Sequence, residues 1–379
     1  MREEAETDKG AAKKLLEKTI SAIRPVSEEY RDRCKRHWDS LCKPIGGFGA
    51  LEDMVSLIGA VQKTDDPRID RTAIVIMAAD NGVVAEGVSQ CGSDVTAQVV
   101  RNMTEQKSSV CIMSKFRAAD VIPVDIGMNA PAYPEPAPDA PYPEPAPDGR
   151  LLERTVRRGT GNIRTGPAMT RAEAVRAIDE GIRIAKNLKE NGYQLLVPGE
   201  MGIGNTTTSA ACVCAIFGMD PAETAGRGAG LTEEGVRRKA EVIRDAIAVN
   251  RPDPGDMLDV LSKVGGLDIA GMTGLFLGAA GAGLPVLIDG FIAALSACIA
   301  VRLSPAAKQY MIPSIVSSEP GDRILLESLG MKAGLSFGMH LGEGTGAAAL
   351  LPLLDEALFL YRNLPAFPES GIKAYKPLL

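Results

Sequence analysis

Five short apolar segments that alternate with helical patterns constrain the fold of this chain most. They lie at residues 73–80, 120–127, 193–200, 285–290 and 312–319. Each is a continuous apolar run that ends in acidic, glycine or serine residues, which is typical of strands buried on both faces of a parallel sheet. Between them lie amphipathic patterns such as 170–191, where Thr170 and Glu173 form a capping box. The sequence therefore predicts an α/β fold with helical crossovers between parallel strands.

Charge and cysteine usage exclude several classes of function. The formal net charge is −6 and no cluster of five or more Lys or Arg occurs, which argues against nucleic acid as a partner. The seven cysteines are widely spread without a CxxC pair, and the chain has only two histidines, so we expect neither a zinc site nor a disulfide framework. The charged N-terminus lacks an apolar signal core, which predicts a cytoplasmic protein.

The weakly charged stretch 270–301 resembles a membrane span in length. It contains six glycines together with Pro285 and Asp289 near its centre, and such residues are costly inside a bilayer. We expect a helix, a strand at 285–288 and a buried helix at 291–302 instead, and no membrane partner.

A proline-rich repeat interrupts the α/β pattern at residues 130–149. It reads YPEPAPDA at 133–140 and YPEPAPDG at 142–149. Such a run forms neither a helix nor an interior strand, so we predict an exposed insertion loop. The alternative is a proline-rich docking ligand.

Three glycine-rich segments precede helices and indicate a site built on backbone contacts. They are GEMGIGNTTTSAA at 199–211, GRGAG at 226–230 and GEGTG at 342–346. Glycines let N–H groups approach a ligand and a helix N-terminus favours an anion, so the first segment predicts phosphate binding. A glycine turn capped by Asn or Thr, without a ligand, remains the alternative.

Two carboxylates at the ends of these elements are candidates for acid–base chemistry. Glu343 lies between two glycines before an apolar helix at 347–361, where apolar neighbours raise a carboxyl pKa toward a general base's working range. Glu200, at the end of another predicted strand, is a candidate for the same acid–base role. Stabilisation of the helix dipole is the structural alternative for Glu343.

Taken together, the segments resemble the nicotinate-nucleotide:dimethylbenzimidazole phosphoribosyltransferase family, which makes the lower-ligand nucleotide of cobalamin-type corrinoids. The resemblance runs from about residue 43 to residue 360. It is carried by KPIGGFGALE (43–52), AADNGVVAEGVS (78–89), GTGNIRTGPAMT (159–170), PGEMGIGNTTT (198–208), DVLSKVGGLDIAGMTG (259–274), LPVLIDGF (284–291) and LGEGTGAA (341–348).

This resemblance implies a reaction and the residues that perform it. A benzimidazole nitrogen displaces nicotinate from the anomeric carbon of nicotinate mononucleotide, giving α-ribazole 5′-phosphate, and Glu343 accepts the azole N–H proton. The residues that the resemblance assigns to the substrates are Glu200, Gly202, Gly204, Asn205, Thr206, Gly228, Lys239, Ser317, Gly342, Gly344, Ser89, Cys91 and Gln98. It implies no metal or cofactor.

The resemblance also implies an architecture. It is a three-layer α/β/α Rossmann-like domain at 61–349, with a smaller helical domain formed by residues 1–60 and 350–379, in a homodimer.

The chain departs from the family pattern at two positions. Asn81 and Ile315 stand where the AADHG-type and IPSHxSAE-type motifs have histidine, so the identity of the accepted base is open. A non-catalytic protein that binds a nucleotide or a corrinoid precursor is the alternative function. A dinucleotide-dependent oxidoreductase is a third, since Gly342, Gly344 and Ala347 fit the G-x-G-x-x-A pattern.

Overall fold

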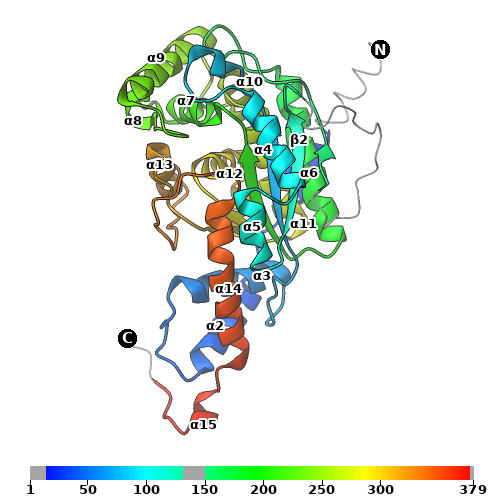
Figure 1. Cartoon of the computed structure of the whole chain (residues 1–379). Coiled ribbons are helices and arrows are strands. Elements are labelled where there is room, and N and C mark those ends of the chain that lie inside the picture. The colour runs from blue at the N-terminus through cyan, green and yellow to red at the C-terminus, as the bar shows by residue number, and fades with distance from the viewer. Residues whose placement is uncertain (1–13, 131–149, 376–379) are drawn as a thin grey trace.

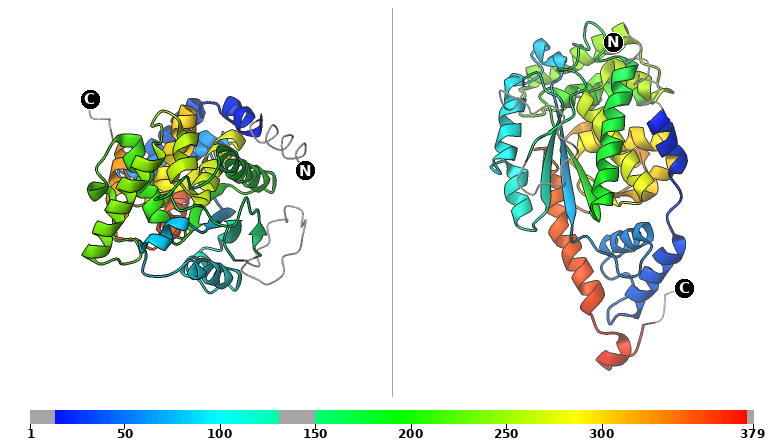
Figure 2. Two further views of the ribbon diagram at one scale, coloured as in Figure 1. Left: turned by 90° about the horizontal axis from the view of Figure 1, so that it is seen from above. Right: turned by 90° about the vertical axis from the view of Figure 1, so that its right-hand side faces the viewer.

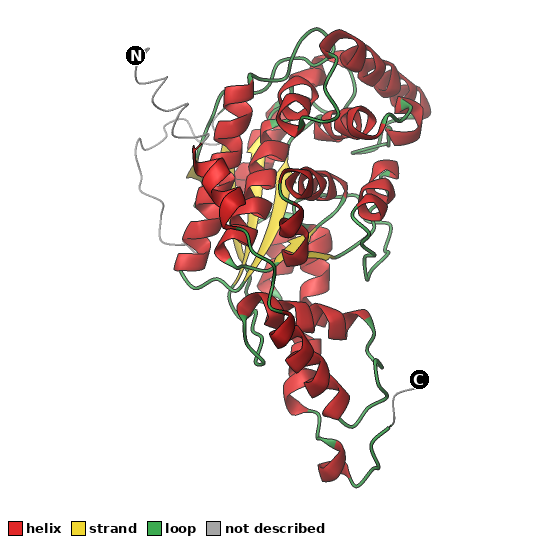
Figure 3. Cartoon of the chain, turned by 180° about the vertical axis from the view of Figure 1, so that it is seen from behind, coloured by secondary structure: helices red, strands yellow, loops and turns green. Residues whose placement is uncertain are grey.

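A six-stranded parallel sheet forms the centre of the protein, whose computed structural model describes residues 14–130 and 150–375 (Figures 1 and 3). The strand order is β3-β2-β1-β4-β5-β6. The strands are β1 Thr72–Ala79, β2 Asp120–Gly127, β3 Leu152–Glu153, β4 Leu195–Met201, β5 Val286–Ile288 and β6 Met311–Pro313. The predicted α/β class with a parallel sheet is confirmed. Sequence reasoning missed β3, and the run predicted at 312–319 is a strand only as far as Pro313.

The helical elements follow in chain order. After a helical segment at residues 14–22, they are α2 Glu28–Ser40, α3 Ala50–Gln62, η1 Gly82–Glu86, α4 Asp94–Thr104, α5 Ser109–Lys115, α6 Arg171–Glu190, α7 Asn205–Phe217, α8 Pro221–Thr224, α9 Glu233–Asn250, α10 Met257–Val264, α11 Leu267–Ala282, α12 Phe291–Leu303, η2 Pro305–Tyr310, α13 Pro320–Ser328, α14 Thr345–Asn363 and α15 Phe367–Ser370. The stretch 270–301 thus lies in helix, strand and helix as predicted. No helix in the described ranges 14–130 and 150–375 is long and apolar enough to cross a membrane.

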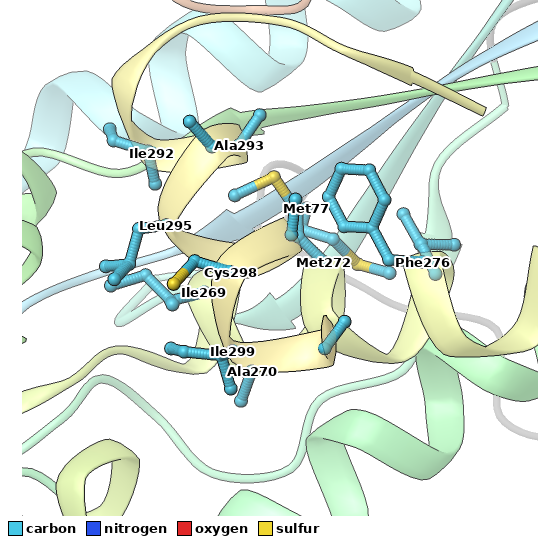
Figure 4. Close-up of a cluster of buried hydrophobic side chains, with 14 of the residues drawn as sticks. Met77, Ile269, Ala270, Met272, Phe276, Ile292, Ala293, Leu295, Cys298 and Ile299 are labelled. Atoms are coloured by element: carbon cyan, nitrogen blue, oxygen red, sulfur yellow. The ribbon is translucent and has the colours of Figure 1, made fainter. Parts of the chain in front are cut away.

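Both faces of the sheet are covered, because successive side chains of β1 point to opposite sides. Ala73, Val75 and Met77 belong to one core, which includes α6, α11 and α12, whereas Ile74 and Ile76 belong to a second core with α4, α5 and α14. Figure 4 shows Met77 of the sheet beside residues of α11 and α12. The sheet is therefore the middle layer of three, as predicted.

Helices α6 and α11 pack with almost no space between their backbones. A Cβ atom at Gly274 of α11 would collide with the carbonyl oxygen of Ile178 in α6, and one at Gly181 of α6 would collide with that of Gly271. Glycine at these positions lets α6 and α11 approach each other closely, and this packing fixes Asp268 at the start of α11 below the site described next.

A smaller helical lobe lies below the sheet, formed by α2, α3, α15 and the C-terminal part of α14 (Figures 1 and 2). Trp38 packs edge-on against Tyr361 with ring centroids 5.0 Å apart, and Lys43 Nζ lies 2.8 Å from the Glu52 carboxylate. Leu16 and Ile23 join the core of the α/β part instead. The segment around them therefore packs against the α/β part. Residues 131–149 of the predicted insertion loop lie outside the described residues.

Candidate active site

A cavity of about 300 Å³ lies at the carboxyl ends of β4, β5 and β6, where open parallel sheets bind their ligands. The direction of the sheet's connections reverses between β1 and β4, which is the topological switch point of such folds. The walls of the cavity include the segment that follows β4, the Gly228 region, the Gly342–Gly346 segment and residues 88–91. Three segments that are far apart in the sequence, all rich in glycine, therefore meet at one cavity.

The segment after β4 forms the first wall. Gly204 adopts a left-handed conformation (φ 92°) and caps α7, and Gly202 has no space for a Cβ because Ala79 O would lie 2.5 Å away. The Asn205 side-chain amide donates to Asp268 Oδ2 at 2.9 Å and also to Glu200. These contacts fix Glu200 at the edge of the cavity and bring the start of α7 up to it.

Glu200 is held in a form that ionises with difficulty. Burial raises its pKa to about 8, and the charges of Asp268, Asp289 and Glu343 raise it further, while the bond from Asn205 opposes the shift. At neutral pH the carboxyl group is therefore mostly protonated, which reduces the negative charge that an anionic substrate meets.

The second wall provides positive charge. Lys239 lies on α9 and is fully buried, and its Nζ donates to Thr206 Oγ1 at 2.9 Å and to Gly226 O at 3.2 Å. Burial lowers its pKa to about 8, and the charge of Glu319 counteracts this. Lys239 thus lies directly behind Thr206, which lines the cavity, and joins the α7 segment to the Gly226–Gly230 segment.

The third wall holds Glu343 in an unusual backbone conformation. Glu343 has φ 58° between Gly342 (φ 84°) and Gly344 (φ 73°), and a positive φ is costly for a non-glycine residue. Gly199 permits this turn, because a Cβ there would lie 2.8 Å from Gly344 N. Asp289 Oδ1 accepts from Ala347 N at 2.8 Å and anchors the start of α14.

The carboxyl group of Glu343 has the environment expected of a general base. Burial raises its pKa, and the backbone N–H of Val110 in α5 partly opposes this shift. The buried Oε2 of Glu343 has no hydrogen-bond partner in the described part of the chain. A carboxylate oxygen with a raised pKa and without a partner, at the wall of a cavity, is suited to accept a proton.

The structure brings most of the predicted site residues together. The following line the cavity: Glu343, Glu200, Gly202, Gly204, Asn205, Thr206, Gly228, Ser317, Gly342, Ser89 and Cys91. Lys239 and Gly344 lie directly behind this wall. Gln98 does not reach it, because it lies on the exposed side of α4, opposite buried residues such as Ala97 and Val100, and donates to Asp94 at 3.0 Å.

The two departures from the family pattern lie in different places. Ile315 lines the cavity and packs against Gly346. Asn81 is buried behind the cavity, beside Gly204 and Gly266, where its Oδ1 accepts from Thr208 at 3.4 Å. Only Ile315 therefore forms part of the wall that a substrate meets.

Sequence reasoning missed Asp289 and Glu319, which also line the cavity. Both are the acidic residues at the ends of the predicted runs 285–290 and 312–319, and an acidic residue at the carboxyl end of a buried run was the available signal. The G-x-G-x-x-A match at Gly342 follows the irregular segment 332–341 rather than a strand, so it lacks the strand that a dinucleotide-binding fingerprint requires. The oxidoreductase alternative therefore has no structural support.

Comparison with known proteins defines the class first. The chain matches the family model described as "Phosphoribosyltransferase" over residues 23–372. It is thus an α/β phosphoribosyltransferase by fold and by family.

Curated and solved relatives narrow this class. A nicotinate-nucleotide–dimethylbenzimidazole phosphoribosyltransferase from Ruminiclostridium cellulolyticum is 42% identical over 363 residues, covering 96% of this chain and 99% of the relative. The enzyme of that name from Escherichia coli (strain SE11) is 40% identical, covering 93% and 94%. The crystal structure of CobT from Thermus thermophilus superposes with a TM-score of 0.82 at 36% identity, covering 92% and 100%. The chain belongs to the nicotinate-nucleotide–dimethylbenzimidazole phosphoribosyltransferase family.

Proposed function

We propose that this protein transfers the phosphoribosyl group of nicotinate mononucleotide to 5,6-dimethylbenzimidazole or a related base. The observation that carries the proposal is Glu343, whose partly buried carboxyl group has a raised pKa at the wall of a cavity. A helix start lines the same cavity, and a buried lysine lies directly behind it. The names of the relatives support this catalytic function over a protein that only binds a nucleotide.

The phosphate and ribose would bind at the α7 segment and the Gly226–Gly230 segment. Asn205 and Thr206 begin α7, whose N-terminus favours an anion. Lys239 adds an ammonium group that is linked to Thr206. Gly228 and Ser317 complete this part of the cavity wall. The phosphate would then lie among backbone N–H groups and one buried positive charge.

The base would lie between Glu343 and the apolar residues of the opposite wall. Val95 and Val99 of α4 line the cavity, as do Ser89 and Cys91. One azole nitrogen attacks the anomeric carbon while the bond to the nicotinate nitrogen breaks and its electron pair leaves with nicotinate. The Glu343 carboxylate takes the proton from the other azole nitrogen, so the product nucleotide is released without a positive charge on its base.

Nicotinate release tests this function directly. Purified protein with nicotinate mononucleotide and dimethylbenzimidazole should release nicotinate and form a product with the mass of α-ribazole 5′-phosphate. Absence of release with every member of a panel of benzimidazoles, adenine and phenols would refute it. The panel is needed because Ile315 forms part of the cavity wall, and a methyl group in such a pocket changes specificity by only about 1–3 kcal/mol.

We further propose that the protein is a cytoplasmic homodimer with a small helical domain at its chain ends. Ile112 on α5 is 56% exposed, Phe116 directly after α5 is 83% exposed, and Phe359 on α14 is 65% exposed. Arg117 Nη2 donates to Asp355 at 2.9 Å, one helical turn before Phe359, so these apolar side chains flank one ion pair. Exposed apolar residues grouped in this way are typical of protein interfaces. Sedimentation of Phe116→Asp should show a monomer if this surface is the interface, and an unchanged dimer would contradict the assignment.

A further inference from the structure

Glu319 occupies a position in which it competes with the substrate's phosphate. It lies directly before α13 and is 8% exposed. Its Oε1 accepts from the backbone N–H of Gly228 at 2.8 Å. This amide belongs to the glycine-rich segment that faces the cavity, so a carboxylate of the protein already takes a donor that a phosphate would need.

The same carboxylate is the counter-charge of the buried lysine. Lys239 Nζ donates only to the neutral Thr206 Oγ1 and Gly226 O among the described residues, and Glu319 is the carboxylate that favours its charged form. The two groups make no direct ion pair within the described chain. Lys239 therefore keeps a free donor while its charge is compensated from a distance.

Glu319 is also poorly satisfied where it lies. The Oε2 of Glu319 is buried without a hydrogen-bond partner in the described residues. It lies directly beside Gly226, where a Cβ atom would collide with it. A buried carboxylate oxygen without a donor is unfavourable, so little holds this side chain except the Gly228 amide and the charge of Lys239.

A second cavity beside the first offers another place for the carboxylate. It is lined by Glu319, Gly228, Arg227 and Arg237 among others. The two arginines are largely exposed. Each lies 3.8–4.0 Å from the Glu233 carboxylate, and Arg227 Nη1 also donates to Leu231 O at 3.4 Å. A carboxylate that leaves Gly228 would thus find positive charge on the other side of the Gly226–Gly230 segment.

We propose that Glu319 is a specificity-determining residue that holds the place of the substrate's phosphate and swings toward Arg227 and Arg237 when a phosphate binds. This inference rests on the proposed function, because it assumes that Gly228 and Lys239 bind phosphate. A dianion beside a fixed carboxylate would be strongly repelled at this depth. A ligand without a phosphate would leave Glu319 in place, so the exchange sets the affinity for phosphate-bearing ligands and does not affect that for nucleosides.

Binding of inorganic phosphate tests the exchange. Glu319→Gln keeps the shape and an acceptor for Gly228 but removes the competing charge, and no helix cap is lost because the Glu319 side chain makes no capping bond. Calorimetry should show phosphate binding at least about tenfold tighter in this variant, equivalent to one pKa unit of interaction. Glu327→Gln, an exposed glutamate on the same α13, is the matched control and should change affinity less than twofold.

The possible outcomes separate this inference from the proposed function. Unchanged or weaker phosphate binding in Glu319→Gln, with wild-type binding that Lys239→Ala abolishes, would overturn the exchange and leave the phosphate site intact. If no variant binds phosphate, the site itself is wrong and the exchange falls with it. A crystal structure of the wild type with phosphate provides an independent test. Glu319 still bonded to Gly228 there would overturn the inference, whereas Glu319 directed at Arg237 would support it.

Discussion

Replacing Glu343 with glutamine tests the proposed base most sharply. Glutamine has the same length and still offers an oxygen to the Val110 N–H, so the left-handed turn between Gly342 and Gly344 should persist. The amide cannot accept the azole proton. Loss of a positioned general base costs about 10²–10⁴ in rate, which is roughly 2.7–5.5 kcal/mol in activation free energy. We expect kcat to fall by this factor and KM for nicotinate mononucleotide to stay within about threefold.

The pH profile distinguishes a base from a structural residue. Burial raises the pKa of Glu343, so the active carboxylate form is lost as the pH falls through this raised value. In the wild type, kcat should therefore decline on the acid side at a pH above the ordinary range of a glutamate. Glu343→Gln should lack this decline.

The assay is nicotinate release followed by chromatography between pH 5 and pH 9. Glu356→Gln, an exposed glutamate on the same α14, is the matched control and should behave as the wild type. A kcat for Glu343→Gln within fivefold of the wild type, or an acid limb that survives in this variant, would refute the role of Glu343.

Three further substitutions probe other parts of the structure. Lys239→Met should weaken nucleotide binding and yet raise the free energy of unfolding at pH 7 by about 1–3 kcal/mol, because the folded wild type must carry a buried ammonium whose pKa is lowered to about 8. Denaturant titration measures this gain in stability, which should shrink as the pH rises from 8 toward 10.5. Ile315→Ala should enlarge the cavity, cost about 2–5 kcal/mol of stability and shift the acceptor preference toward bulkier benzimidazoles, and an unchanged ranking of acceptors would contradict its place in the base pocket. Gly274→Ala should destabilise the protein by about 1–3 kcal/mol in thermal unfolding because its Cβ meets Ile178 O, and an unchanged melting temperature would show that α6 and α11 separate easily.

The sheet and its helices follow from local sequence patterns, with failures where the pattern is too short. β1, β2 and β4 were predicted within two residues at each end because all are continuous apolar runs buried on both faces. β3 has only two residues and is defined by pairing with Val124 and Asp125, so no periodicity could reveal it. β6 stops at Pro313 because the chain then changes partner: Ser314 Oγ donates to Ile288 O at 2.5 Å, and Ile315 pairs with Leu335 instead of β5.

The site was harder to predict from residue patterns than the fold. Glu343 could be named from its flanking glycines, but its contact with Val110 depends on the packing of α14 against α5. Lys239 lies on the buried side of α9, where a lysine is unusual, and only resemblance to a family indicated its role. The same resemblance suggested Gln98, which lies on the exposed side of α4 and does not line the cavity.

Several carboxyl groups line the cavity, so an anionic substrate binds there only if part of their negative charge is removed or compensated. An anionic nucleotide must enter a site that contains Glu200, Asp289 and Glu343. Burial raises the pKa of Glu200 to about 8 and that of Asp289 to about 6, and Asp289 Oδ1 accepts a hydrogen bond from the Ala347 N–H. At neutral pH Glu200 is mostly neutral and Glu319 is bonded to the Gly228 N–H, which leaves Glu343 as the carboxylate best placed to accept a proton. Since the charge of Glu343 contributes to the shift of Glu200, protonation of Glu343 during the reaction should lower the pKa of Glu200, and the two groups should titrate as a coupled pair.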